Sequence, residues 1–267
     1  MEIATVGTLL EAVRQPFAGF GLAFARCFGM LSVLPLATRL GLHGMLRAGV
    51  AAALACLLAP ALLPAIAAAP PAAPRWMLLT AKEALAGFLL GVLFALPFWA
   101  AELAGEMVDE QRGSRGAVAP DAASDEQSGI TATLIALTLI TLFLIQGGMH
   151  LLIEALMASY RVWPALQLAP ALAEDMPRQV LGLLDAALRA GFVLAFPLLA
   201  AMLLAELSLA LISRFAPQLN VFDLAMSVKG LIHVIGLPVY AVFLISYLRQ
   251  GLAPLAQFEA LLRRLLP

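Results

Sequence analysis

The stretch Gln127–Ile153, QSGITATLIALTLITLFLIQGGMHLLI, decides the fold, because its 27 residues contain no acidic or basic side chain apart from His150. About 20 apolar residues are enough for an α-helix to cross a bilayer. Lipid leaves the backbone only two solutions, helices or closed barrels, and the alternating pattern of barrel strands is absent. The sequence therefore predicts an all-α integral membrane protein. Further charge-free runs lie between Arg47 and Arg75, Glu83 and Glu102, and Lys229 and Arg249.

The composition supports the same fold class. The chain has 267 residues, of which 63% are hydrophobic and 12% charged, and its mean hydropathy is +0.96. Soluble domains are about 45–50% apolar and about 25% charged, so lipid or an equally apolar partner must cover the excess. The net charge of −1 gives no basic field that would attract nucleic acid.

We expect a single helical membrane domain over residues 1–267, with no cleaved signal peptide at its start. The prolines between residues 60 and 74 are expected to end the second helix. The acidic, glycine-containing segment after the third helix is expected to form a loop over residues 105–129. The six apolar helices predicted are 16–38, 46–68, 76–105, 129–157, 180–212 and 229–248.

Two weaker patterns concern symmetry and orientation. Residues 82–106 and 182–206 share glycine, proline and glutamate positions at an offset of 100, which suggests a repeat of two proline-kinked helices. If six helices span, nine basic residues fall on one side and six on the other. This excess favours both termini in the cytoplasm, as the positive-inside rule predicts. The Gly87–Gly91 pair forms a GxxxG motif, which permits close helix packing.

Ionisable residues inside apolar helices are candidates for function, because they are costly to place there. They are Arg26, Glu102, Glu154 and Glu206. Glu102 shares one helix face with Glu106 and Asp109, and Arg112 extends this stripe. The stripe is compatible with a proton path, an ion site, an inter-subunit ion-pair network or a solvated helix end. Lys229 and His233 also share a face.

Motifs for catalysis, metal binding or nucleotide binding are missing from the sequence. Cys27 and Cys56 lie in apolar stretches without metal or redox spacing, and we expect them to act as small hydrophobic residues. The sequence thus predicts no enzyme, no cofactor and no metal site.

Three stretches resemble the T subunit of type III secretion export apparatuses, the family that includes the flagellar biosynthesis protein FliR. They are Ala25–Leu36 (ARCFGMLSVLPL), Glu102–Gly113 (ELAGEMVDEQRG) and Ser208–Phe222 (SLALISRFAPQLNVF). His150 and the segment Ser159–Pro164 (SYRVWP) fall where the family has similar residues. The QRG form and the residues Met226–Lys229 resemble the virulence-type branch more than the flagellar branch.

The resemblance implies a non-enzymatic subunit of an inner-membrane export gate, which forms and closes a pore for unfolded proteins. It implies several copies of R-type and S-type subunits as partners, together with U-type and V-type subunits. It implies a multi-pass inner-membrane protein that is partly raised toward the periplasm in the gate. A pore-plugging segment maps to Gly105–Gly116. The expected plug residues are Gly105, Glu106, Asp109, Gln111, Arg112 and Gly113, and the expected subunit-contact residues are Arg26, Glu206, Arg214, Pro217, Asn220, Phe222 and Lys229.

A second function fits the residues alone. A small-solute secondary transporter would use Glu102, Glu106 and Glu206 as proton or ion carriers, and the helices with Pro97 and Pro197 as broken elements. Co-purification separates the two hypotheses, because a gate subunit forms a stable hetero-oligomer with small helical membrane subunits.

Overall fold

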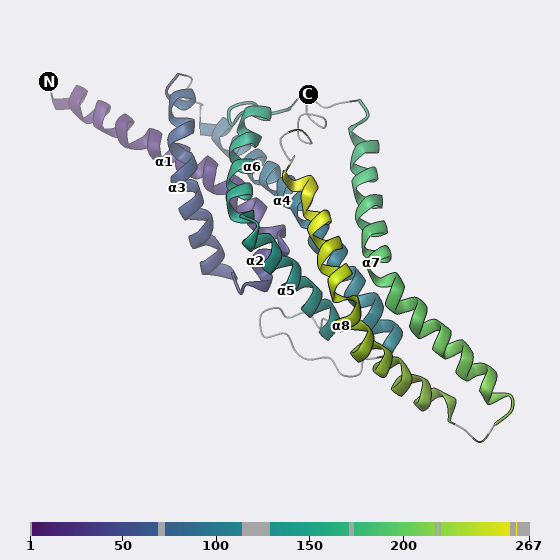
Figure 1. The fold of residues 1–267 in the computed structure, drawn as a ribbon. Coiled ribbons are helices and arrows are strands. Elements are labelled where there is room, and N and C mark those ends of the chain that lie inside the picture. Colours follow the sequence, from purple (N-terminus) through teal and green to yellow (C-terminus); the bar gives the residue numbers. More distant parts are fainter. Residues whose placement is uncertain are drawn as a thin grey trace. The chain divides into compact units, whose positions relative to one another are not determined.

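The computed structural model describes residues 2–68, 73–113, 129–170, 174–216, 218, 220–256 and 260. These residues form eight α-helices and no β-strand (Figure 1). The helices are α1 (Glu2–Val33), α2 (Pro35–Arg39), α3 (Gly44–Ala68), α4 (Ala73–Arg112), α5 (Ile130–Ile145), α6 (Gly148–Val162), α7 (Met176–Ser213) and α8 (Val221–Ala256).

Five helices of the described chain are long and apolar enough to cross a membrane. They are α1, α3, α4, α7 and α8, and the bent pair α5–α6 makes a sixth if it is one span. The prediction of an all-α integral membrane protein with about six apolar helices is therefore confirmed.

The predicted fourth helix, 129–157, is wrong as one straight element. It breaks into α5 and α6, which meet at an angle of 74°. Gly147 adopts a φ of +79°, and its N–H donates to the carbonyl of Leu144 at 3.1 Å. A glycine with positive φ just beyond a helix end is the usual way to terminate a helix. The sequence QGG carried this signal within an apolar run.

Other helix ends also differ from the prediction. The first helix stops at Val33, because Leu34 is extended ahead of Pro35. Pro60 and Pro64 do not end the second helix but lie inside α3, which runs to Ala68. Membrane helices tolerate internal proline better than soluble ones.

The expected start of the polar loop at residue 105 is also wrong, because α4 continues to Arg112. Its last turns, EMVDEQR, consist mostly of good helix formers. The remainder of the expected loop, 114–128, lies outside the described residues.

The described chain forms two compact units. The first comprises residues 1–95, 148–179 and 255–267. In it α1 and α3 pack side by side, and the first part of α4 and α6 complete the helices (Figure 1). Its core contains Leu22, Met30, Leu34, Leu58, Ile66, Leu79, Phe94, Leu152 and Leu156.

Helices α1 and α4 cross in the first unit with almost no side chain between them. A Cβ atom on Gly87 would overlap the backbone carbonyl of Arg26, and one on Gly91 would meet the carbonyl of Met30. Gly29 approaches the backbone of α4 in the same way. The GxxxG motif therefore marks a real close approach of two helices.

The second unit comprises residues 96–147 and 180–254. In it the last part of α4 runs antiparallel to α5, and α7 runs antiparallel to α8 (Figure 1). The last part of α4 pairs with α5, as the contact of Phe98 with Phe143 shows. Helix α7 pairs with α8, and Leu198 of α7 lies against Gly236 of α8. Its core contains Ala101, Ala104, Val108, Ile135, Leu139, Leu194 and Met202, in addition to Phe98, Phe143 and Leu198.

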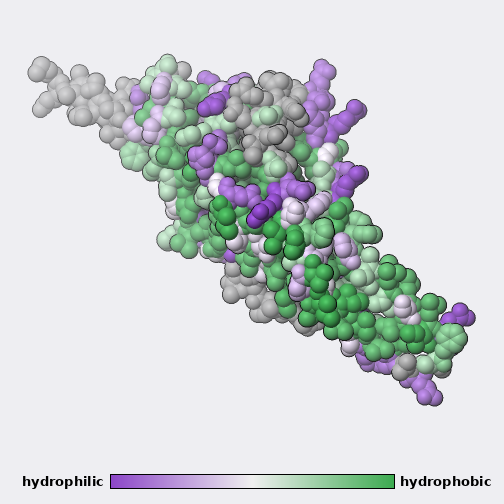
Figure 2. All heavy atoms as spheres, viewed as in Figure 1, coloured by the Kyte–Doolittle hydropathy of each residue, from purple (hydrophilic) through white to green (hydrophobic). Residues whose placement is uncertain are grey.

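Helices α7 and α8 expose most of their apolar side chains. In their most apolar windows only 22% and 17% of the residues are buried, against 50% in α4. Hydrophobic residues dominate the lower right of Figure 2, where α7 and α8 run toward their connection. These two helices therefore need lipid or a partner to cover them. Their most exposed large side chains include Leu204, Leu211, Val234, Val239, Val242 and Phe243.

The close crossing of α1 and α4 predicts opposite effects for two glycine substitutions. Gly87→Ala should lower the thermal unfolding midpoint of the full chain in detergent, because the new methyl group meets the Arg26 backbone. Overpacking of this kind costs about 1–3 kcal/mol. Gly49→Ala on α3 meets open space and should stabilise by up to about 1 kcal/mol through helix propensity. A Gly87→Ala variant as stable as Gly49→Ala would contradict the crossing.

Candidate functional site

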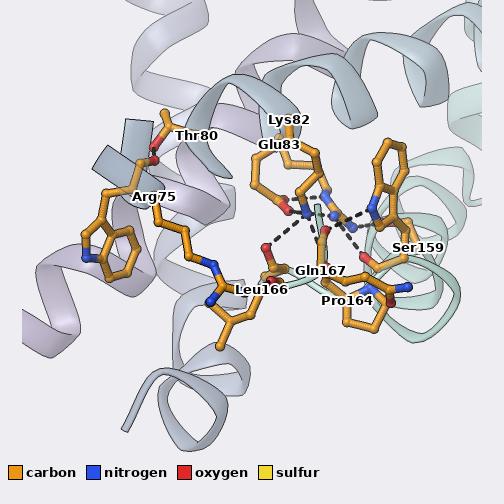
Figure 3. A network of polar contacts seen from close by, with 12 residues as sticks. Arg75, Thr80, Lys82, Glu83, Ser159, Pro164, Leu166 and Gln167 are labelled. Carbon is orange, nitrogen blue, oxygen red and sulfur yellow. Dashed lines mark hydrogen bonds and ion pairs between the residues drawn. The ribbon is translucent and has the colours of Figure 1, made fainter. Parts of the chain in front are cut away.

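A buried charge network lies in the first unit, between α1, α4 and the end of α6 (Figure 3). Arg26 and Glu83 are both 0% exposed. The Nε of Arg26 donates to Glu83 at 2.6 Å, and one terminal nitrogen donates to the other oxygen at 2.9 Å. This is the bidentate geometry that makes arginine–carboxylate pairs strong. Lys82 pairs with the same carboxylate, so two cations share one anion.

The two cations also hold the backbone that follows α6. Arg26 donates to the hydroxyl of Ser159 at 2.8 Å and to the carbonyl of Trp163 at 3.0 Å. Lys82 donates to the next two carbonyls, of Pro164 and Ala165, at 3.2 and 3.0 Å. Non-helical backbone inside an apolar protein is stable only when its polar groups are satisfied. The network therefore fixes the turn after α6.

Aromatic rings enclose the same cations. The guanidinium of Arg26 lies 3.7 Å from the centre of the Tyr160 ring, and Lys82 lies 5.3 Å from that of Trp163. Cation–π contacts gain strength when water is excluded. The motif SYRVWP and Arg26, which the sequence singled out separately, thus meet in one cluster. Lys82 and Glu83 were missed, because the sequence alone placed them at the edge of an apolar run.

Arg26 was expected to contact other subunits, but all its side-chain contacts described here lie within its own unit, and it has no exposed surface. Any effect of Arg26 on assembly would therefore act through the fold of this chain. Its role in assembly stays a prediction.

A second polar cluster joins the end of α4 to the start of α5. Asp109 is 2% exposed, and its Oδ2 accepts the backbone N–H groups of Thr131 at 2.8 Å and Ala132 at 3.2 Å. Glu106 accepts the N–H of Gly129 at 3.1 Å. The first N–H groups of a helix have no partner in the helix itself, and carboxylates there also favour the helix dipole. Two acids of α4 thus cap α5.

Two glycines make this cap possible. A Cβ on Gly129 would occupy the place of the Asp109 carboxylate, and one on Gly105 would collide with the backbone of Thr131 and Ala132. Gly105 is therefore a packing residue inside α4. In the stripe of acids expected at this helix face, Glu106 and Asp109 accept backbone N–H groups at the start of α5, and Asp109 is buried.

Further polar residues of the second unit join the cluster. Arg112 donates to Asp109 Oδ1 at 3.2 Å. Gln111 and Lys229 donate to Glu206 Oε2 at 3.1 and 3.3 Å, from α4 and α8 to α7. Glu206 keeps 46% of its side chain exposed, whereas Lys229 keeps 11%.

Thr131 and His233 complete the cluster. The Thr131 hydroxyl lies 2.6 Å from Asp109 Oδ1 and 3.3 Å from His233 Nε2. Thr131 could not be singled out from the sequence, because a threonine at the start of an apolar helix is common. His233 was noted only for its spacing from Lys229.

The other candidate residues lie apart from these clusters. Gly113 follows α4 with a φ of +77° and faces the side chain of Met226. Arg214 and Asn220 are exposed in the connection between α7 and α8, where Asn220 bonds to Asp223. Pro217 and the side chain of Phe222 lie outside the described residues. Glu154 is exposed and pairs with His150 at 3.1 Å.

The described residues contain no group of three or more histidine, cysteine, aspartate or glutamate side chains that could hold a metal ion. What both clusters can do chemically is hold backbone and charge in fixed positions.

The cap on α5 predicts a local effect of Asp109→Ala. Hydrogen exchange at the first turn of α5 should accelerate, because the N–H groups of Thr131 and Ala132 lose their acceptor. Loss of a cap costs about 0.5–2 kcal/mol. Exchange mass spectrometry of the full chain in detergent measures this. Asp185→Ala, on the exposed face of α7, is the control, and an unchanged α5 peptide in Asp109→Ala would refute the cap.

Comparison with known proteins places the chain in a family. Residues 17–254 match the model of the bacterial export proteins, family 1. The chain is 37% identical over 240 residues to the Yop proteins translocation protein T of Yersinia pestis, which covers 90% of this chain and 92% of that protein. The surface presentation of antigens protein SpaR of Shigella sonnei is 30% identical over 153 residues, 57% of this chain and 58% of that protein. The flagellar biosynthetic protein FliR of Bacillus subtilis is 28% identical over 158 residues, 58% of this chain and 60% of that protein. With a family match over residues 17–254 and a relative that is 37% identical over 90% of its length, this chain belongs to the bacterial export proteins, family 1.

Proposed function

We propose that the protein is a non-enzymatic subunit of the inner-membrane export gate of a type III secretion system. The observation that carries this proposal is the similarity to a Yop translocation protein over 90% of the chain. The large apolar surface of α7 and α8 supports a role in a hetero-oligomer embedded in lipid. The cargo in this proposal is unfolded secreted protein.

The virulence-type branch is the better proposal for this chain. The Yersinia relative is 37% identical over 90% of the chain, whereas the flagellar relative from Bacillus is 28% identical over 58%. The QRG sequence, which spans the end of α4 and the glycine after it, supports the same branch. The partners proposed are several copies of R-type and S-type subunits, with U-type and V-type subunits, in a gate raised in part toward the periplasm.

The end of α4 is the proposed gating element. Arg112 and Gly113 stand where the chain leaves the helix, and Asp109 holds Arg112 at 3.2 Å. Glu106 and Asp109 accept backbone N–H groups at the start of α5. These hydrogen bonds hold the end of α4, and with it the proposed gate residues, in a fixed position. Gly105 and Gln111 contribute through packing and through the bond to Glu206.

The connection between α7 and α8 is the proposed assembly contact. Arg214 and Asn220 are exposed polar residues between two helices with uncovered apolar surface. In this proposal they bond to neighbouring subunits, with Glu206 and Lys229 as a further polar contact on the same pair of helices.

The small-solute transporter has less support. Glu106 binds the backbone of Gly129, and Glu206 binds Lys229 and Gln111. Carboxylates engaged in this way are structural partners within the unit.

Two variants in the natural host separate gating from assembly. Arg112→Gln should leave the complex intact but make membranes of non-secreting cells leakier to ions, because the gate residue loses its ion pair with Asp109. Asn220→Ala should reduce co-purification of the other export subunits. Thr138→Ala, which removes an exposed hydroxyl on α5, is the control. Secretion by a strain whose tagged protein purifies alone would overturn the proposed function.

A further inference from the structure

We infer that Thr131 and His233 are positioning residues of the gate: they hold Asp109 and, through it, Arg112, although neither side chain contacts Arg112 in the bonds described. The inference rests on the proposed gating role of Arg112. It assigns a function to two residues on other helices, α5 and α8, that the motif of the gate segment does not contain.

The direction of the hydrogen bonds follows from their lengths. A threonine hydroxyl has one proton to donate. The distance of 2.6 Å from Thr131 Oγ1 to Asp109 Oδ1 is that of a strong bond to a carboxylate. The hydroxyl proton therefore points to Asp109, and Thr131 must accept from the Nε2–H of His233 at 3.3 Å. The chain of donors runs from His233 through Thr131 to Asp109.

These three hydrogen-bonded side chains are buried, so their polar groups have little access to water. Asp109 and Thr131 are each 2% exposed and His233 is 9% exposed. The Nδ1 atom of His233 is buried and has no hydrogen-bond partner among the described residues. The ring thus gives its only bond described here to Thr131. Polar groups in such places are costly to leave unsatisfied, so each bond constrains the next.

The two carboxylate oxygens of Asp109 bind different partners. Its Oδ2 is occupied by two backbone N–H groups of α5, while its Oδ1 serves both the Thr131 hydroxyl and Arg112. The two N–H bonds anchor Oδ2, and the short bond from the Thr131 hydroxyl adds a restraint on the oxygen that Arg112 binds. Loss of the hydroxyl removes this restraint from Oδ1 and weakens the hold on Arg112.

The cluster joins three helices at one point. His233 belongs to α8, Thr131 to α5 and Asp109 to α4. One turn before His233, Lys229 of α8 pairs with Glu206 of α7. A displacement of α8 would therefore change the position of Asp109, the residue that binds Arg112. The hydrogen bonds thus couple the proposed gate to the apolar helices α7 and α8.

The test uses threonine variants of the full chain in the natural host. Thr131→Val keeps the shape but removes the hydroxyl, and Thr131→Ser restores it. Thr138→Val and Thr141→Val are matched controls, because their exposed hydroxyls bond only to carbonyls of α5 in the contacts described. Ion leakage of non-secreting cells should rise in Thr131→Val to the level of Arg112→Gln and stay at the wild-type level in the other three.

The double variant checks that Thr131 acts through Arg112. Thr131→Val combined with Arg112→Gln should leak no more than Arg112→Gln alone. His233→Leu should leak, and His233→Gln, whose amide can donate to Thr131, should not. If Arg112→Gln leaks ions but Thr131→Val does not, the positioning role of Thr131 is refuted. The proposed gating role of Arg112 is then unaffected.

A second measurement covers the case in which Arg112→Gln does not leak, which would remove the proposed gating role. Trypsin cleavage after Arg112, followed by mass spectrometry on the purified full chain, reports how firmly this side chain is held. Cleavage should increase about tenfold in Thr131→Val, since a hydrogen bond to a charged group is lost, and remain unchanged in Thr131→Ser and Thr138→Val. Equal cleavage in all variants would refute the positioning role whatever the gate does.

Discussion

A charge placed in an apolar helix must find its partner inside the protein, and the rest of this structure depends on that constraint. Arg26 pairs with Glu83, and Lys82 shares the same carboxylate. Arg26 also donates to the Ser159 hydroxyl, and both cations donate to carbonyls that follow α6. Asp109 meets the first turn of α5. Leaving such a charge without its partner costs about 3–5 kcal/mol, which is comparable to the stability of many whole domains.

The same constraint explains the glycines. Gly87 lets α1 approach α4 closely enough for Arg26 to reach Glu83, one turn away from that glycine. Gly105 and Gly129 let α4 and α5 approach so that Asp109 can cap the helix. In both units a missing side chain makes room for a buried charged one. Arg26, Glu83 and Asp109 are buried, whereas many large apolar side chains of α7 and α8 are exposed and available to lipid or to other export subunits.

The sequence predicted the all-α class and about six apolar helices of membrane length, because charge-free runs of this length leave few alternatives. It missed the break at Gly147, which depends on one positive φ inside an apolar run. It also missed the helical course of α4 to Arg112, because the change to polar residues after residue 105 resembles the start of a loop. The prediction that the chain belongs to an export family was confirmed, because its motifs are spread over almost the whole chain.

For the sites, the sequence could identify charged residues but not their partners. Glu106, Asp109 and Arg112 were recognised as one face, yet the partners of the two acids include backbone N–H groups at residues 129–132, which no side-chain pattern reveals. Glu83 escaped notice for a related reason. Its partner Arg26 lies 57 residues away, and a glutamate at the border of an apolar run is ordinarily a solvated one.

The most direct test of this account is the thermal stability of the full chain in detergent for Glu83→Gln, Arg26→Gln and the double variant. Glu83→Gln leaves Arg26 and Lys82 without the carboxylate that both contact, whereas Arg26→Gln leaves the Lys82–Glu83 pair in place. We expect a larger fall in the unfolding midpoint for Glu83→Gln, and a partial recovery when Arg26→Gln is added. Independent, additive losses, or a Glu83→Gln variant as stable as the wild type, would contradict it.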